Sequence, residues 1–224
     1  MTAAVAGAFC ARYVADPAEL AALFRVRHEV FRLDMGLSAD TDDDGSMEKD
    51  AYDADSVHIA CFHDSGRLAG YVRLICGTPN LPTLVLYDLA RRFADPAGEV
   101  SRLIVTPEFR RSDLISRLVR STLFELVERA AYAHGVTNLF SIGRPAVFTL
   151  LRSGRAAFEP IEGARPVNLH LYGPMYRDFF ARGEVVPMRV SLIRPGGEGD
   201  WLPNQRDEVR SGCKYQQRPL YDRE

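Results

Sequence analysis

Four charged side chains lie in segments whose other residues are mostly apolar. Glu99 and Arg102 belong to the strand-like segment "GEVSRLIV". Arg73 belongs to "GYVRLICG", and Arg27 lies beside the apolar stripe of a predicted helix. A charge inside a protein core is costly unless it is paired. Each of these residues therefore needs a partner or a chemical role. A structural salt-bridge network is one interpretation, and a functional site is the other.

Successive side chains of a strand point to opposite faces of its sheet. This alternation predicts that Glu99 and Ser101 share one face of the central strand, while Arg102 points to the other face. On this interpretation the two charged residues of the segment need separate partners.

The segment "ADTDDDGSMEKDAYDAD", residues 39–55, is rich in acid. Asp40, Asp42, Asp44 and Gly45 fall on the first, third, fifth and sixth positions of an EF-hand loop. The twelfth position, which requires a bidentate carboxylate, is Ala51. A strand-like pattern also follows where the second EF-hand helix should stand. We therefore interpret "DTDDDG" as a solvated loop and expect no metal.

The second half of this segment differs, because it leads directly into a strand. Tyr52 and Asp53 come just before the strand-like "SVHIACF". A loop residue in such a place can be held rigidly and aimed at a site. The carboxylates of "EKDAYD" are therefore candidates for a functional role.

A third motif joins the predicted strand "GEVSRLIV" to a long helix. Arg110, Arg111 and Ser112 stand where that helix begins. Free N–H groups and a partial positive charge at a helix N-terminus suit an anion such as a phosphate, and arginines strengthen such a site. An ordinary turn with exposed arginines is the alternative. The sequence contains no Walker loop, GxGxxG fingerprint, GxSxG nucleophile motif or HExxH zinc motif.

These motifs need a scaffold, and hydrophobic periodicity predicts an α/β domain around a mixed sheet. The first helix should begin after Asp16, with Glu19 completing a capping box, and end at Gly36. The remaining predicted elements are a hairpin over 56–77, a strand over 98–106, a long helix over 112–134, a strand over 136–143, a short helix over 144–154, and a strand within 167–180.

Composition limits the class of protein. The 224 residues are 46% apolar with a net charge of -2, which suits a globular chain without a broad nucleic-acid or membrane-surface footprint. No apolar run is long enough to span a membrane. Four scattered cysteines are typical of reduced thiols in the cytoplasm. We expect one domain over residues 1–190 and a polar extension over 191–224.

Taken together, the motifs resemble the autoinducer-synthase branch of the GNAT-like acyltransferases. This branch comprises the acyl-homoserine-lactone synthases and the long-chain N-acyl amino acid synthases. The resemblance covers roughly residues 20–175. The matching residues are Arg27 and Phe31 in "RHEVF", Asp50 and Asp53 in "EKDAYD", Arg73 in "GYVRL", and Glu99, Ser101 and Arg102 in "GEVSRL".

The resemblance implies a GNAT-like three-layer fold with a splayed central sheet. It also implies transfer of a fatty acyl group from an acyl-ACP or acyl-CoA thioester to the amine of an amino acid-like acceptor. No tightly bound cofactor is implied, and acyl carrier protein becomes an expected partner. The implied roles are catalysis for Glu99, Ser101 and Arg102, acceptor binding for Arg27, Phe31, Asp50, Asp53 and Arg73, and phosphopantetheine binding for Arg110, Arg111 and Ser112.

One departure from the family pattern favours the amino acid acyltransferases. The lactone synthases carry a tryptophan shortly after the first helix, and here that position is Leu37. Two alternatives stay open. One is a lactone synthase that consumes S-adenosylmethionine, and the other is a non-catalytic module that binds an acyl thioester or calcium.

Overall fold

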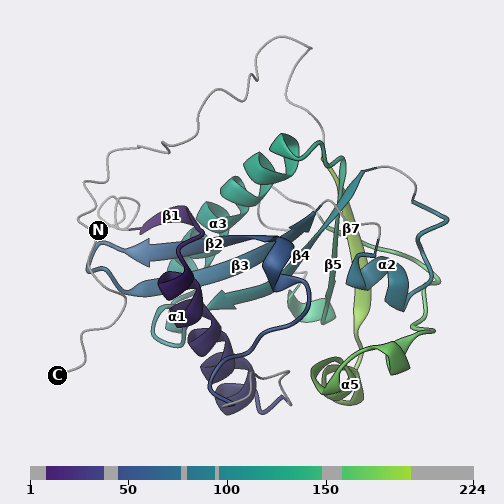
Figure 1. Cartoon of the computed structure of the whole chain (residues 1–224), viewed down its shortest axis with the longest axis horizontal. Helices are drawn as coiled ribbons and strands as arrows, with labels where there is room; N and C mark the ends of the chain where they lie inside the picture. The colour runs from purple at the N-terminus through teal and green to yellow at the C-terminus, as the bar shows by residue number, and fades with distance from the viewer. Residues whose placement is uncertain (1–8, 38–44, 77–79, 94–95, 148–157, 193–224) are drawn as a thin grey trace, which may run out of the picture.

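The computed structural model of the chain describes residues 9–37, 45–76, 80–93, 96–147 and 158–192. Within these ranges seven strands form one sheet in the order β1-β2-β3-β4-β5-β7-β6 (Figure 1). The β4–β5 pair is parallel and the other pairs are antiparallel. The strands are β1 (Phe9–Val14), β2 (Ser56–His63), β3 (Leu68–Cys76), β4 (Ala97–Val105), β5 (Asn138–Gly143), β6 (Glu159–Pro160) and β7 (Val186–Ser191).

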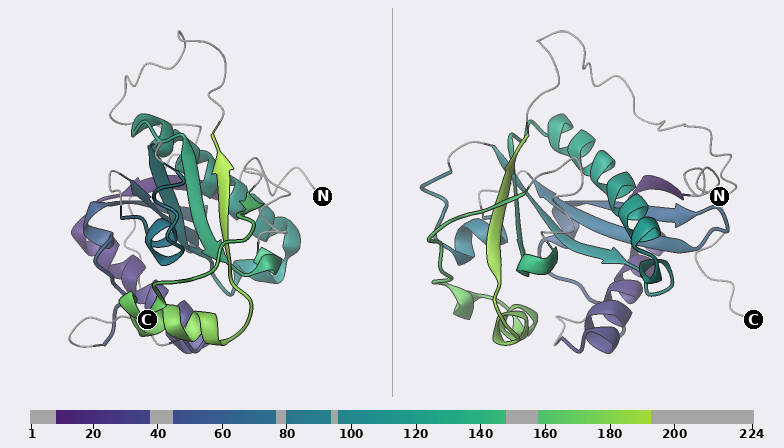
Figure 2. Two further views of the ribbon diagram at one scale, coloured as in Figure 1. Left: turned by 90° about the vertical axis from the view of Figure 1, so that its right-hand side faces the viewer. Right: turned by 180° about the vertical axis from the view of Figure 1, so that it is seen from behind.

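Helices cover both faces of the sheet, which gives three layers (Figure 2). The long helix α3 crosses one face, and α1, α2 and α5 lie on the other. The helical segments are α1 (Pro17–His28), the π-helix η1 (Glu29–Asp34), η2 (Asp53–Asp55), α2 (Pro82–Leu86), η3 (Phe109–Arg111), α3 (Asp113–Ala133), η4 (Leu169–Leu171) and α5 (Pro174–Ala181). The predicted mixed α/β fold is confirmed.

Close contact between α3 and the sheet depends on Gly70. A Cβ atom at this position would lie 2.5 Å from Cγ1 of Val119 and 2.8 Å from the backbone oxygen of Ile104. Only glycine leaves room for the helix here. Around this contact, Val119, Leu123 and Val127 are fully buried against the sheet.

The sheet opens between β4 and β5. Their pairing runs only from Ala97 opposite Asn138 to Glu99 opposite Phe140, although β4 continues to Val105. The two strands therefore separate just beyond Glu99, as the predicted splayed sheet requires.

The first helix begins as predicted, but its capping box does not form. The side chain of Asp16 accepts hydrogen bonds from the N–H groups of Ala18 and Glu19, both at 3.0 Å. The carboxylate of Glu19 instead accepts two hydrogen bonds from Arg12. Its partner is on β1, a strand that the sequence did not predict. After His28 the helix widens into η1 and ends before Gly36, which has a φ of 64°.

Some of the other predicted elements are confirmed, and one is wrong. The hairpin and the long helix are confirmed as β2–β3 and α3. The strand predicted within 167–180 is wrong, because this segment forms η4 and α5. Strand β7 was not predicted. Residues 145–147 are helical, whereas the expected helix end at Gly154 lies outside the described residues, as does nearly all of the extension.

None of the helices within the described ranges is long and apolar enough to cross a membrane. Within the same ranges, no cluster of His, Cys, Asp or Glu is arranged to hold a metal ion. Residues 40–44 of the calcium-like stretch lie outside them.

Candidate active site

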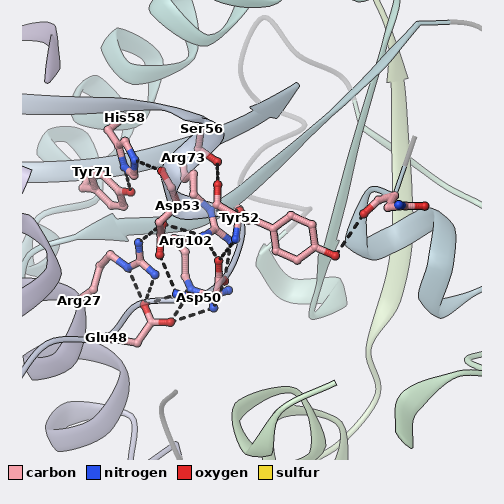
Figure 3. Close-up of polar contacts among 12 residues, drawn as sticks. Arg27, Glu48, Asp50, Tyr52, Asp53, Ser56, His58, Tyr71, Arg73 and Arg102 are labelled. Carbon is pink, nitrogen blue, oxygen red and sulfur yellow. Dashed lines mark hydrogen bonds and ion pairs between the residues drawn. The ribbon is translucent and has the colours of Figure 1, made fainter. Parts of the chain in front are cut away.

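Three arginines and three carboxylates form one buried ion-pair network on the α1 side of the sheet (Figure 3). Its members are Arg27, Arg73, Arg102, Glu48, Asp50 and Asp53. Three positive and three negative charges balance, which is what burial demands.

Arg27 and Arg73 form the centre of this network, and neither side chain is exposed to solvent. Arg27 donates from Nε to Glu48 at 2.5 Å and from Nη1 to Asp53 at 2.5 Å. Arg73 donates from Nη1 to Asp50 at 2.6 Å and to Asp53 at 2.7 Å. Carboxylates from three positions thus pair with the two guanidinium groups, and neither group is exposed to solvent.

Glu48 was missed by the sequence reasoning, although its side chain is fully buried. It bridges Arg27 to Arg102, whose Nη2 donates to Glu48 Oε1 at 2.9 Å. The N–H of Glu48 also donates to the carbonyl of Phe24, which fixes this segment against α1. The sequence did hold a signal for it. Besides Glu99, only two acids, Asp50 and Asp53, were predicted near three core arginines, so a third acidic partner was missing.

A bulge in β4 overturns the predicted alternation of side chains. The β3–β4 register passes from Tyr71 opposite Ile104 to Arg73 opposite Ser101, so β4 carries an extra residue. Arg102 sits there with a φ of 56°, which is strained for a residue with a Cβ.

The consequence is that Ser101 and Arg102 point to the same side of the sheet. Ser101 Oγ accepts a hydrogen bond from Arg73 Nε at 3.0 Å, and Arg102 Nη2 donates to Asp50 at 2.8 Å. The expectation that Arg102 faces away from Glu99 and Ser101 is therefore wrong. The bulge brings all three residues of the motif to one cavity.

Local hydrogen bonds hold the acidic turn before β2. Asp50 Oδ1 accepts from the N–H of Tyr52 at 2.9 Å, and Asp53 Oδ2 accepts from the N–H of Asp50 at 2.8 Å. Burial raises the pKa of Asp50, but the positive charges of Arg73 and Arg102 more than offset it, so the pKa lies well below its ordinary value. Asp50 is therefore ionised at neutral pH.

Glu99 has a different environment from the network. Its side chain is buried and accepts a hydrogen bond from the N–H of Thr83 at 2.7 Å. Burial raises the pKa of Glu99 to about 7, although the hydrogen bond from the N–H of Thr83 and the charges of Arg73 and Arg102 oppose the shift. A carboxyl group with this pKa exchanges protons near neutral pH, as a general base must.

An apolar cavity of about 220 Å³ opens where β4 and β5 separate. Glu99, Ser101 and Arg102 line it, as does Phe31 from η1. The guanidinium of Arg102 lies over the rings of Phe31 and Tyr176, with Cζ 5.8 Å from each ring centroid. The other lining residues are Met35, Leu37, Val100, Leu103, Phe124, Ser141, Ile142, Gly143, Arg144, Val147, Met175 and Phe179.

The remaining predicted residues do not line this cavity. Arg27, Arg73, Asp50 and Asp53 lie behind Arg102 in the network. Their contact with the cavity is indirect, because Asp50 forms an ion pair with Arg102 in the cavity wall.

The predicted phosphate-binding turn also lies outside the cavity lining. Ser112 caps α3, because its Oγ accepts from the N–H of Ile115 at 3.5 Å. Arg110 forms an ion pair with Asp34 of η1, and Arg111 is exposed.

We compared the chain with known protein families. Residues 26–120, which include the network and all of β4, match the family model for the acetyltransferase (GNAT) domain. The matched stretch is less than half of the chain, and it is similar to a GNAT acetyltransferase domain. The chain is an acyltransferase, as the family resemblance implied. No curated protein matches its sequence.

Solved structures with the same fold as this chain include both kinds of synthase that the resemblance named. FeeM, an N-acyl amino acid synthase from uncultured soil microbes, is 18% identical, with a TM-score of 0.58 over 82% of this chain and 90% of that one. The CoA-dependent acyl-homoserine lactone synthase BjaI, solved with SAM and isopentyl-CoA, is 18% identical, with a TM-score of 0.57 over 84% of each chain. The acyl-homoserine-lactone synthase LasI is 14% identical, with a TM-score of 0.57 over 82% and 89%.

Proposed function

We propose that this chain transfers a fatty acyl group from a thioester to the amine of an amino acid-like acceptor. The observation that carries the proposal is Glu99, a buried carboxyl group with a pKa of about 7 in the wall of an apolar cavity. A poised base beside an apolar pocket suits an amine nucleophile and an acyl chain.

The proposed reaction needs no covalent enzyme intermediate. The deprotonated amine attacks the thioester carbonyl carbon, and the carbon–sulfur bond breaks to release the thiolate. Glu99, acting through a water molecule, takes the amine proton and returns a proton to the thiolate. Backbone N–H groups at the β4 bulge, where the ladder skips Val72, would stabilise the oxyanion.

The opening between β4 and β5 supplies a path for the acyl chain. Val100, Leu103 and Phe124 line the cavity on the side that faces α3. An aliphatic chain placed there would gain about 0.8 kcal/mol for each buried methylene. This apolar lining supports a fatty acyl group over a short polar one.

The acceptor-binding residues take narrower roles in this proposal. Phe31 would contact the acceptor directly, because it lines the cavity. Arg27, Asp53 and Arg73 would act by positioning Arg102, together with Asp50.

Two carriers are candidates for the acyl donor. BjaI is a CoA-dependent synthase that was solved with isopentyl-CoA, and its fold is shared here. Acyl carrier protein is the other carrier that we propose. The turn at Arg110, Arg111 and Ser112 would approach the phosphate of either pantetheine arm, and donor binding would then have to displace Asp34 from Arg110.

A substrate panel tests this function. Purified protein is offered acyl-CoA and acyl-ACP of several chain lengths together with free amino acids and S-adenosylmethionine, and products are identified by mass spectrometry. We expect N-acyl amino acids, and none with Glu99→Gln on the same time scale. Lactone products would assign the S-adenosylmethionine reaction instead. Tight thioester binding without any product would indicate a non-catalytic module.

A further inference from the structure

Arg144 is the cavity's second arginine, and it lies outside the ion-pair network. It follows β5 directly and lines the cavity. Its Nη2 donates to the carbonyl of Phe179 at 3.1 Å, and its Cζ lies 5.0 Å from the centroid of that residue's ring. A Cβ at Gly183 would lie 2.9 Å from Nη1 of Arg144, so the guanidinium packs tightly against the turn that follows α5.

Arg144 differs from the network arginines, because their positive charges are neutralised by nearby carboxylates. Arg102 is paired with two carboxylates, Glu48 and Asp50. Within the described ranges, no carboxylate forms an ion pair with Arg144. An apolar cavity with one uncompensated guanidinium is complementary to a ligand that carries one anionic group.

We propose that Arg144 binds the carboxylate of the acceptor, so that the enzyme selects amines bearing a free acid. This inference rests on the proposed function, since it names the acceptor's second anchor. A guanidinium fork and a carboxylate can form two parallel charge-assisted hydrogen bonds, which fix orientation as well as affinity. The acceptor would then be held by its acid at Arg144 while its amine faces Glu99.

The spacing along β5 fits such an acceptor. Phe140 pairs with Glu99, and alternation places Phe140 and Ile142 on one face of β5. The strand ends at Gly143, about 10 Å from the pair that holds the base, and Arg144 is the next residue. A long arginine side chain, one water beside Glu99 and a small amino acid together span this gap.

A donor phosphate is the competing anion, and the structure disfavours it. The pantetheine arm separates the thioester from its phosphate by a long chain. With the thioester at Glu99, the phosphate lies beyond a cavity of about 220 Å³. The acceptor's acid, in contrast, is close to the reacting amine.

The test compares an amino acid with its primary amide, which retains the amine but lacks the charge. The wild type should prefer the acid over the amide by about 10- to 100-fold in kcat/KM, the range of a charge-assisted hydrogen bond. Arg144→Gln should remove most of this preference by raising the acceptor KM while leaving the donor KM unchanged. Arg144→Lys should retain part of it.

Arg177 provides a matched control, because it is an exposed α5 arginine that also donates to a carbonyl, that of Tyr172, and does not line the cavity. Arg177→Gln should keep the full preference. The inference is overturned if the wild type acylates acid and amide equally, or if Arg144→Gln raises the donor KM instead. Failure of every amine to be acylated would refute the proposed function, which is a separate outcome.

Discussion

At the residue scale, the pKa values of two acidic residues in the same site shift in opposite directions. Asp50 faces Arg73 and Arg102, whose charges overcome burial and lower its pKa. Glu99 is also near these arginines, yet burial dominates and raises its pKa to about 7. One carboxylate therefore stays charged as a structural partner, while the other is available to carry a proton.

The raised pKa of Glu99 makes the folded state less stable at high pH than at low pH. The folded state retains the proton up to about pH 7, whereas the group's ordinary pKa is 4.5. Its contribution to the free energy of unfolding therefore falls as pH rises from about 4.5 to 7. The stability of Glu99→Gln relative to the wild type should therefore rise by roughly 3 kcal/mol across that window. Urea unfolding at pH 5 and pH 8 measures this, and an equal difference at both values would contradict it.

Removal of Glu48 should have the opposite effect. Glu48→Gln leaves Arg27 and Arg102 buried without a charged partner between them. We expect a loss of about 3–5 kcal/mol in the free energy of unfolding, the usual result of breaking a buried pair. Glu125→Gln is the matched control, because Glu125 pairs with Arg129 in an exposed i,i+4 bridge that should cost less than about 1 kcal/mol. Similar losses for both variants would show that the network does not hold the core.

At the scale of single elements, local signals explain what the sequence predicted. Helix α3 has a capping serine, a sustained apolar stripe and a terminal glycine, and the hairpin has an unambiguous turn. Strands β1 and β7 lack such signals, since each is defined by pairing with a strand far away in the chain. The bulge at Arg102 carries no glycine, so nothing in the sequence marked it.

Packing of α3 against the sheet gives a prediction at this scale. Gly70→Ala places a Cβ too close to Val119 and to the backbone oxygen of Ile104. Overpacking of this kind costs about 1–3 kcal/mol, measurable by chemical unfolding. Adding Val119→Ala should not restore full stability, because the backbone oxygen cannot move away. Complete rescue by the second substitution would show that the helix side chain alone sets the fit.

At the scale of the whole molecule, the splayed sheet joins the two halves of the reaction. The cavity reaches from Phe31 and Tyr176 on the α1 side to Phe124 on the α3 side. The sequence predicted the splay only through family resemblance. The cavity's depth depends on how α3, α5 and η1 close around it, which no local pattern encodes.

Phe124 closes the α3 end of the cavity and packs edge-to-face on Phe158 at a centroid distance of 6.1 Å. Phe124→Leu should shift the preferred acyl chain to greater length, with roughly 4-fold in kcat/KM for each added methylene that becomes buried. Leu126→Ala is the control, since Leu126 is a buried α3 residue outside the cavity lining. It should destabilise the protein without changing chain-length preference. An unchanged preference in Phe124→Leu would place the acyl chain elsewhere.

The most direct test of the proposed mechanism is the pH dependence of single-turnover acyl transfer in the wild type and in Glu99→Gln. Loss of a general base typically lowers the rate by about 10² to 10⁴-fold. In the wild type, the rate should fall below about pH 7, where Glu99 becomes protonated. Glu99→Gln should be slower by about 10²-fold or more and should lack this acidic limb. A variant that keeps both the wild-type rate and the limb would show that Glu99 is not the base.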